Sequence, residues 1–456
     1  MAYSFATRLE NLKKLAQEEF DIVVIGGGIN GAGIARDASS RGLKVALVEA
    51  NDFASGTSSR SSKLIHGGIR YLENMEFGLV FEALSERRLL FQMAPHLVHP
   101  LRFMLPLYRG GRVGMFKLGL GMWLYDALSF FEAPKMHERL SAFQTKTRMP
   151  FLDENDLLGS YVYSDAYMDD DRLVIETLRS AEKFGAITVN YCSAVSGIKT
   201  DGIVTAIDAR DELTQNRFTI RGRHFISTVG PWTDLVAPHL VGEWKRKMRP
   251  SKGVHLTFDR KRIPLDEAVV MISDDEKRIV FAIPRHEMVI IGTTDTDFPQ
   301  DPRSVHTDQK DVDYLLAVAQ QYFPGARLKE SDILASYSGV RPLVHDGSAT
   351  ESKTSREHTI LTDNRNVTFV MGGKYTTYRL IAEEAVLQAL QAMGLAGELK
   401  FLKSDSKAPL NPLVTDERLS RARIQALSVA QKYERSEQTV LSLIERHGEE
   451  AFEILE

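Results

Sequence analysis

Short apolar runs near the start of the chain alternate with stretches of small and helix-forming residues. Residues 20–25 (FDIVVI) are a β-branched run that leads directly into glycines, as a buried parallel strand does before a turn. The pattern predicts a helix over 31–41 and a second strand over 44–48 that ends at Glu49. Together these segments predict a βαβ unit, preceded by an amphipathic helix within residues 1–20.

Two kinds of periodicity run through the remaining chain. Helical spacing of apolar residues predicts helices over 82–93, 171–184, 308–322 and 378–393. Short strands are predicted over 187–191, 224–229 and 367–371, the first two as parts of the first sheet. Four runs between 253 and 294 (GVHLTF, AVVMI, RIVFAI and MVIIGTT) predict an antiparallel sheet in an inserted domain. Residues 51–68 read as a loop that wraps a ligand, and residues 96–150 as irregular and aromatic-rich.

The composition is that of a folded protein with two or three domains. The chain has 456 residues, 43% hydrophobic and 26% charged, which excludes a disordered or fibrous chain. Its 57 basic and 61 acidic residues give a formal charge of −4, so no overall attraction to nucleic acid is expected. The single cysteine, Cys192, cannot form an internal disulfide or hold an iron–sulfur cluster, and it suits a reducing, cytoplasmic location.

No segment of the sequence predicts a membrane span. The nearest candidate, residues 113–131, contains Lys117 and Asp126. Peripheral attachment stays open, because basic residues of this region are interleaved with apolar and aromatic ones: Arg102, Arg109, Arg112 and Lys117 with Phe103, Met104, Met115, Phe116, Trp123 and Tyr125. The alternative interpretation is an ordinary helical part of a substrate domain.

A glycine-rich turn lies between the first predicted strand and helix. The sequence GGGING matches G-x-G-x-x-G through Gly26, Gly28 and Gly31, with Asn30 inside the turn. Glycines let the backbone approach a pyrophosphate, and the helix N-terminus supplies amide donors. Glu49 ends the next strand, where a carboxylate hydrogen-bonds ribose hydroxyls and repels an added 2′-phosphate. This context predicts dinucleotide binding, against the alternative of a glycine-rich turn without a cofactor.

A second glycine turn favours FAD over NAD. Residues 367–378 (VTFVMGGKYTTY) combine a strand, Gly372, Gly373, Lys374 and the start of a helix. A second helix N-terminus can meet the far end of an extended cofactor and stabilise negative charge on a reduced isoalloxazine ring. A flavin requires such a partner more than nicotinamide does. The alternative is a simple turn before a helix.

Three stretches carry a resemblance: IGGGINGAGIARDASSRGLKVALVEANDFASGTSSRSSKLIHGGIRYLE, YSGVRPL and GGKYTTYR. They resemble FAD-dependent glycerol-3-phosphate dehydrogenases, within the wider group similar to glycine oxidase and D-amino-acid oxidase. The similarity extends from about residue 20 to 393, and SSKLIHGGIRYLE is far more specific than the glycine motif. The resemblance implies oxidation of sn-glycerol 3-phosphate to dihydroxyacetone phosphate by hydride transfer from C2 to flavin N5, with electrons passed to a membrane quinone.

Candidate substrate-binding residues follow from the phosphate and from the resemblance. Planar guanidinium groups bind phosphate oxygens well, so Arg70 and Arg341 are candidates within the similar motifs. Lys374 is expected near the flavin or the substrate hydroxyls. The resemblance further suggests that Ser62, Tyr71 and Lys252 lie close to the flavin face.

Loss of the hydroxyl proton requires a group that titrates near the operating pH, which points to histidine. His66 in LIHGG and His255 in GVHLTF are the two candidates, and the residues alone do not rank them. A structural role is the alternative for each. Asp295 and Asp297 read as turn residues, and no metal site is expected.

Other cofactor contacts are expected from positions in the motifs. Ser61 and Ser62 are expected to meet the pyrophosphate or flavin, and Val195 to pair its backbone with adenine. Further contacts are expected from Gly230 and Trp232, which would close over the nucleotide, and from Gly372, Gly373, Lys374 and Thr376 around the flavin.

The expected architecture is a doubly wound, Rossmann-like α/β FAD domain with an inserted antiparallel-sheet domain. The FAD domain is expected over 18–95, 150–235 and 330–395, the substrate domain over 96–149 and 236–329, and a C-terminal helical segment over 396–456. The resemblance also implies a homodimer and peripheral contact with the inner face of the cytoplasmic membrane. Two alternative functions stay open: a flavin oxidase of an amine or 2-hydroxy acid, and a flavin-binding redox sensor.

Overall fold

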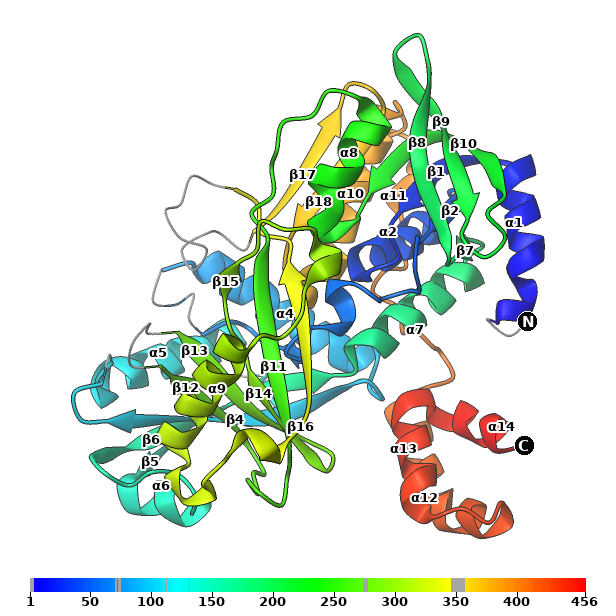
Figure 1. Ribbon diagram of the computed structural model, residues 1–456. Helices are drawn as coiled ribbons and strands as arrows, with labels where there is room; N and C mark the ends of the chain where they lie inside the picture. The colour runs from blue at the N-terminus through cyan, green and yellow to red at the C-terminus, as the bar shows by residue number, and fades with distance from the viewer. Residues whose placement is uncertain are drawn as a thin grey trace.

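Two β-sheets organise the computed structural model of the chain (Figure 1). The structure describes residues 4–69, 72, 75–111, 113–130, 132–273, 278–345 and 357–456. One sheet lies with α1 and α2 at one end of the molecule, and the other lies at the opposite end beside α5, α6 and α9 (Figure 1). The C-terminal helices form a third, smaller body (Figure 1).

The first sheet has the strand order β17-β18-β10-β1-β2-β7, with β9 on β10 and β8 on β9. Its strands are β1 Glu19–Ile25, β2 Val45–Val48, β7 Ile187–Val189, β8 Cys192–Thr200, β9 Ile203–Asp211, β10 Arg217–Ser227, β17 His358–Asp363 and β18 Val367–Gly372. The central pairs β18-β10, β10-β1, β1-β2 and β2-β7 are parallel. The predicted doubly wound α/β fold is confirmed, and so are the strands expected over 187–191 and 224–229.

Helices cover both faces of this sheet. The central strand β1 has apolar side chains on both faces, and the helices bury them. Ile22 and Val24 pack in one core with α2 Ile29–Ser40, α7 Asp170–Lys183 and α10 Tyr378–Ala392. Val23 and Ile25 pack in the opposite core, with residues from α1 Arg8–Gln17 and α8 Thr233–Val241. A strand buried on both faces needs a continuous apolar run, which explains why FDIVVI was readable as a parallel strand.

The second sheet has the order β15-β11-β14-β13-β12-β4-β6-β3, with β16 on β11 and β5 on β6. Its strands are β3 Leu64–Ile65, β4 Val98–Tyr108, β5 Glu138–Ser141, β6 Leu157–Met168, β11 Ser251–Asp259, β12 Ala268–Ile272, β13 Ile279–Arg285, β14 Met288–Gly292, β15 Thr296–Asp297 and β16 Ile333–Arg341. Its helices are α4 Phe77–Met93, α5 Met115–Leu128, α6 Ala142–Arg148 and α9 Gln309–Tyr322. The four predicted runs form β11 to β14 in antiparallel pairing.

Residues 96–150 are regular, so the expectation of irregular structure is wrong. They contain β4, α5, β5 and α6. Pro100 and Pro106 conceal β4 in the sequence, since proline is rare inside a paired strand. β4 tolerates them because its second neighbour, β12, pairs only at Phe103 and Met104.

The division of the chain into an FAD domain and a substrate domain stays a prediction. Two strands from the range expected for the FAD domain belong to the second sheet. β6 and β16 fall within the ranges expected for the FAD domain, yet both pair in the second sheet. Sheet membership thus crosses the boundary between the two predicted domains. β16 in particular brings Arg341 next to Ser251 of β11.

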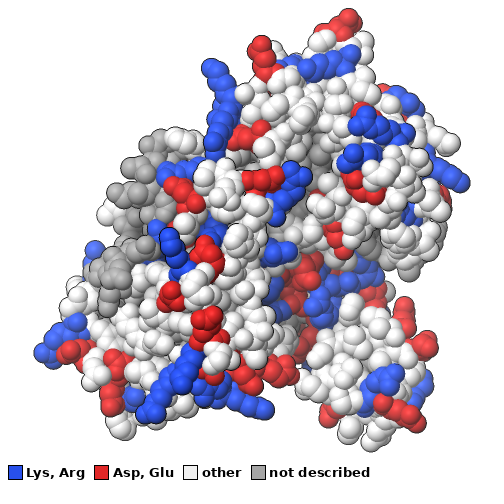
Figure 2. Space-filling model, viewed as in Figure 1, with Lys and Arg blue, Asp and Glu red and all other residues white. Residues whose placement is uncertain are grey.

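The C-terminal segment is helical, as predicted. It contains α11 Leu399–Leu402, α12 Asp416–Lys432, α13 Glu437–His447 and α14 Ala451–Leu455, and the last three share a small core of their own. The body formed by α12, α13 and α14 contacts α7 through polar side chains, where Arg179 pairs with Glu450 at 2.7 Å. Phe401 and Leu410, earlier in the segment, pack in the core of the first sheet. Acidic and basic side chains gather at this junction (Figure 2).

Candidate active site

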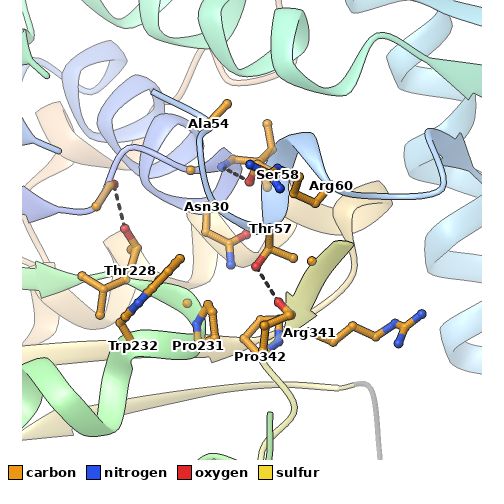
Figure 3. A pocket seen from close by; sticks show the side chains of 18 of the residues that line it. Asn30, Ala54, Thr57, Ser58, Arg60, Thr228, Pro231, Trp232, Arg341 and Pro342 are labelled. Carbon is orange, nitrogen blue, oxygen red and sulfur yellow. Dashed lines mark hydrogen bonds between the residues drawn. The ribbon is translucent and has the colours of Figure 1, made fainter. Parts of the chain in front are cut away.

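An elongated cavity of about 630 Å³ lies between the two sheets. It is lined by both glycine turns, the loop after β2, and the facing strands β11 and β16. Asn30, Thr57, Trp232 and Arg341 come from four different segments and surround it in Figure 3. The predicted residues that line it are Gly26, Gly28, Asn30, Glu49, Ser61, Ser62, His66, Gly230, Trp232, His255, Arg341, Gly372, Gly373, Lys374 and Thr376.

The first glycine turn connects β1 to α2 through a backbone that side chains would obstruct. A Cβ at Gly31 would lie 1.9 Å from the carbonyl oxygen of Gly26, so α2 approaches β1 only with glycine there. Gly31 thus acts behind the turn, whereas Gly26 and Gly28 line the cavity. Ser58 fixes the start of α2 by accepting a hydrogen bond from the Ile29 amide at 3.0 Å (Figure 3).

Glu49 is held at the carboxyl end of β2 by two backbone amides. Its Oε2 accepts from Gly27 N at 2.7 Å, and its Oε1 accepts from Asn51 N at 2.8 Å. Burial raises the pKa of Glu49, while these amide bonds act in the opposite direction. Each carboxylate oxygen has a second lone pair, so the group can also accept from ribose hydroxyls, as its position predicts.

The start of β8 lines the cavity next to Glu49, but Val195, the residue predicted to contact adenine, is not in the described lining. Cys192, Ser193 and Ala194 line the cavity beside Glu49. The register between β8 and β9 shifts between Ala194 and Ser196, so Val195 sits in a bulge. The adenine contact of Val195 stays a prediction, and Ala194 directly before it lines the cavity.

The second glycine turn follows β18 and meets the first across the cavity. Gly372 and Gly373 have φ angles of 71° and 92°, in the left-handed region that favours glycine. Asn30 Nδ2 donates to the carbonyl of Gly372 at 3.4 Å, which joins two turns 342 residues apart. Lys374 follows in the lining, and Thr376 Oγ1 accepts from the amide of His66 at 3.3 Å.

The two candidate histidines line the same cavity in different environments. His255 is 2% exposed, and its Nε2 lies 2.8 Å from Ser62 Oγ. Its ring stacks on Tyr337 with centroids 4.7 Å apart. Burial, with the positive charges of Arg341 and Lys63, lowers the pKa of His255 to about 3. His66 follows β3 and lines the cavity near Thr376.

Arg341 ends β16 with its guanidinium group held by polar atoms of the second sheet. Nη1 donates to Asp295 Oδ1 at 3.1 Å, and Nη2 donates to Thr293 Oγ1 at 2.9 Å and to the Thr294 carbonyl at 3.0 Å. Asp295 is 7% exposed and also accepts from Ser251 Oγ. Asp295 lies in the connection between β14 and β15, in agreement with its interpretation as a turn residue, and it is also the ion-pair partner of a predicted substrate-binding arginine. Asp297 lies in β15 instead.

One predicted substrate-binding residue, Lys252, is not among the described residues that line the cavity. Lys252 points to the opposite face of β11 from His255, because successive strand residues alternate. There its Nζ pairs with Asp308 at 2.7 Å and Asp311 at 2.6 Å. The geometry thus contradicts a substrate-binding role for Lys252. Arg70 and Tyr71 lie outside the described residues.

Sequence reasoning missed three polar residues of the site. Arg60 lines the cavity and donates to the Ser338 carbonyl at 3.1 Å. Tyr337 stacks on His255, and Asp295 pairs with Arg341. A period of two along 333–341 would have placed Tyr337 and Arg341 on one face of a strand. No comparable signal points to Asp295, whose partner is 46 residues away.

A doubly wound nucleotide fold with a histidine- and arginine-containing cavity at its sheet edge defines a dinucleotide-dependent oxidoreductase. Residues 21–379 match the family described as DAO, FAD dependent oxidoreductase. The chain belongs to this family, and the predictions of an enzyme and of FAD as cofactor are confirmed.

Named relatives are similar over most of their length. An aerobic glycerol-3-phosphate dehydrogenase of Staphylococcus saprophyticus is 36% identical over 408 residues, which cover 89% of this chain and 73% of the relative. A protein of the same name from Staphylococcus haemolyticus is 38% identical over 414 residues, 91% of this chain and 74% of the relative.

Solved structures share the fold. The glycerol-3-phosphate dehydrogenase of Bacillus halodurans complexed with FAD has a TM-score of 0.79 at 30% identity, and the match covers 98% of this chain and 79% of that one. An L-α-glycerophosphate oxidase from Mycoplasma pneumoniae with FAD bound has a TM-score of 0.65 at 18% identity, covering 82% and 95%. The second likeness concerns the fold alone.

The residues of the cavity fit FAD. Gly26 and Gly28 leave the start of α2 open to a pyrophosphate, and Glu49 supplies a fixed acceptor on the ribose side. At the other end, the amides after Gly373 and the Lys374 side chain would hold the flavin ring. Among the described residues, no group of three His, Cys, Asp or Glu side chains is arranged to hold a metal ion.

Proposed function

We propose that the protein oxidises sn-glycerol 3-phosphate to dihydroxyacetone phosphate. The observation that carries this proposal is that Arg341 and His255, on paired strands, line one cavity together with Lys374 of the second glycine turn. A phosphate ester needs a fixed cation, and a secondary alcohol needs a proton acceptor. The names of the relatives support the same substrate.

Removal of two electrons from a carbinol carbon takes away a hydride from carbon and a proton from the hydroxyl oxygen. Bound FAD supplies the hydride acceptor at its N5. We propose that His255 takes the hydroxyl proton, because its imidazole is neutral at pH 7 and lines the same cavity as the cations that would bind the phosphate. Ser62 and Tyr337 fix the ring by a hydrogen bond and by stacking. His66 is the second candidate for the same role.

The cations of the cavity are proposed to bind the phosphate ester. Arg341 supplies a guanidinium whose orientation Asp295 and Thr293 fix. Lys374 and Arg60 add positive charge from the second glycine turn and from the loop after β2. An amine or 2-hydroxy acid would need a single cation for its carboxylate, so this number of cations favours the phosphate ester.

The visible spectrum tests this function directly. Addition of glycerol 3-phosphate without air should bleach the flavin absorbance of the purified protein, and a quinone analogue should restore it. Bleaching by an amino acid or a 2-hydroxy acid alone would support the oxidase alternative. A yellow protein that no substrate bleaches would support the redox sensor and contradict the proposal.

We further propose a membrane quinone as electron acceptor, reached by peripheral attachment through α5. Among the described residues, none of the helices combines the length and apolar character of a membrane crossing. α5 nevertheless exposes an apolar face formed by Phe116, Leu120, Trp123 and Leu124, which share one side of the helix. Such a face beside Lys117 suits the headgroup layer of a bilayer.

Phe116→Ser combined with Trp123→Ser should reduce sedimentation with anionic phospholipid vesicles at least about tenfold, because two large apolar side chains no longer enter the bilayer. Phe143→Ser on α6 is the matched control, since Phe143 and Phe116 are both 81% exposed. Flavin reduction by glycerol 3-phosphate should stay unchanged in all variants. Equal vesicle binding by the double α5 variant and the Phe143→Ser control would contradict attachment through α5. The homodimer and the inner-face location stay predictions.

A further inference from the structure

Asp170 is a buried carboxylate that does not line the described cavity but contacts residues that do. It begins α7 and is 0% exposed. Its Oδ2 accepts from Ser61 Oγ at 2.6 Å, and its Oδ1 accepts from Lys63 Nζ at 2.5 Å. A buried carboxylate is costly unless it is paired and hydrogen-bonded. Here both side-chain partners come from one short segment, residues 61–63, and the Asp171 amide adds a third bond to Oδ1 at 2.9 Å.

The same segment has a backbone conformation that needs external support. Lys63 has a φ of 57°, which is uncommon for a residue with a side chain. Its amide donates to Ser61 Oγ at 2.9 Å, so the turn closes on the hydroxyl that Asp170 binds. The carboxylate thereby holds both the first and the last residue of the turn.

Ser62, the middle residue of this turn, faces the catalytic candidate. Its Oγ lies 2.8 Å from Nε2 of His255. Tyr337 stacks on the His255 ring, and its hydroxyl donates to the Ser61 carbonyl at 3.0 Å. The Lys63 Nζ lies 5.8 Å from the centroid of the Tyr337 ring. Displacement of the turn would therefore move both neighbours of His255.

Asp170 also contacts the second glycine turn through its backbone. The backbone carbonyl of Asp170 accepts a hydrogen bond from the hydroxyl of Tyr375 at 2.5 Å. Tyr375 directly follows Lys374 in the lining of the cavity, and Thr376 contacts the His66 amide. One residue thus fixes the turn at Ser62 and the turn at Lys374 against the same end of α7.

We propose that Asp170 is a positioning residue, which aligns Ser62 with His255 and holds the two loops at the flavin end of the cavity in register. The proposal rests on the proposed function for its kinetic part only. Its structural part concerns FAD binding, which the family assignment provides.

Asp170→Asn tests this role against Asp171→Asn, the matched control one residue later. Asp171 is 48% exposed, and its carboxylate pairs with Arg446 at 3.4 Å. Asp170→Asn should raise the Kd for FAD about tenfold and lower the limiting rate of anaerobic flavin reduction at least about tenfold. The half-saturating concentration of glycerol 3-phosphate should change less than about threefold, because Arg341 is held by other residues. Asp171→Asn should leave all three values unchanged.

Lys63→Met provides a second test that leaves α7 intact. Lys63→Met alone should weaken FAD binding in the same direction as Asp170→Asn. The double variant Asp170→Asn/Lys63→Met should bind FAD more tightly than the sum of the single effects predicts, because neither charge of the Lys63–Asp170 pair is left without the other. Additive effects would contradict a coupled pair.

Two outcomes would overturn the proposal. One is equal FAD affinity and reduction rate in Asp170→Asn and Asp171→Asn. The other is a loss of rate in Asp170→Asn that matches only its loss of folded protein, measured by near-UV circular dichroism. If glycerol 3-phosphate does not reduce even the unmodified protein, the proposed function fails. In that case the FAD affinities and flavin spectra of the variants still decide the role of Asp170.

Discussion

Arg341→Ala should raise the KM for glycerol 3-phosphate about a hundredfold while FAD stays bound. A charge-assisted, two-pronged contact with phosphate is worth about 2–3 kcal/mol, and alanine removes it entirely. FAD should be retained because the glycine turns and Glu49 hold the nucleotide elsewhere in the cavity. Arg341→Lys should recover only part of the loss, since an ammonium group keeps the charge without the planar fork.

Two controls separate this effect from damage to the fold. Arg249→Ala removes a neighbouring arginine that pairs with Asp297 at 2.9 Å outside the described cavity lining, and it should leave the KM unchanged. Arg341→Ala/Asp295→Asn also neutralises the buried carboxylate that loses its Arg341 partner in Arg341→Ala, so it should regain thermal stability but not substrate affinity. An unchanged KM in Arg341→Ala, measured with a dye acceptor, would remove Arg341 from the site.

His255→Ala should lower the limiting rate of anaerobic flavin reduction at least about a hundredfold and abolish its dependence on pH. A positioned general base contributes about 10²–10⁴-fold, which sets the expected loss. His66→Ala is the matched comparison, because both histidines line the cavity but only His255 has the Ser62 and Tyr337 contacts. If His66→Ala instead abolishes the pH dependence, the base is His66.

The direction of the pH effect follows from the environment of His255. Burial and two cations lower its pKa to about 3, so the neutral, proton-accepting form exists above that value and is lost as the pH falls through it. A bound phosphate dianion offsets the charge of Arg341 and moves the pKa upward, toward the ordinary value near 6.5. The acid limb of the reduction rate should therefore lie between about pH 3 and 6.5. A limb above pH 6.5 would contradict His255 as the base.

The parts of the fold that sequence patterns predicted are those whose burial is uniform. β1, buried on both faces, and the four runs β11 to β14 are apolar and bounded by turns. β8 was missed because it is only partly buried beyond Cys192 and carries no apolar alternation, and its partner β9 was missed with it. β4 was missed because it contains two prolines, which argue against a paired strand. It tolerates them because it makes few ladder bonds to β12.

The candidate site was predictable where backbone geometry demands particular residues, and less so where side chains find distant partners. Gly26, Gly31 and Gly372 are fixed by close approach or left-handed φ, which a glycine motif reveals. The face of a strand residue such as Lys252 depends on register, which a run of buried residues does not disclose. The pairing of Arg341 with Asp295 depends on the meeting of β16 with the loop after β14.

The bond between Asn30 and Gly372 has a consequence for biosynthesis. Because the second glycine turn is encoded 342 residues after Asn30, a nascent chain cannot enclose its prosthetic group until most of it has left the ribosome. At about 5–20 residues per second, translation as far as residue 376 takes roughly 20–75 s. Flavin loading is thus expected to be a late event in maturation, and stalled or truncated chains should emerge colourless.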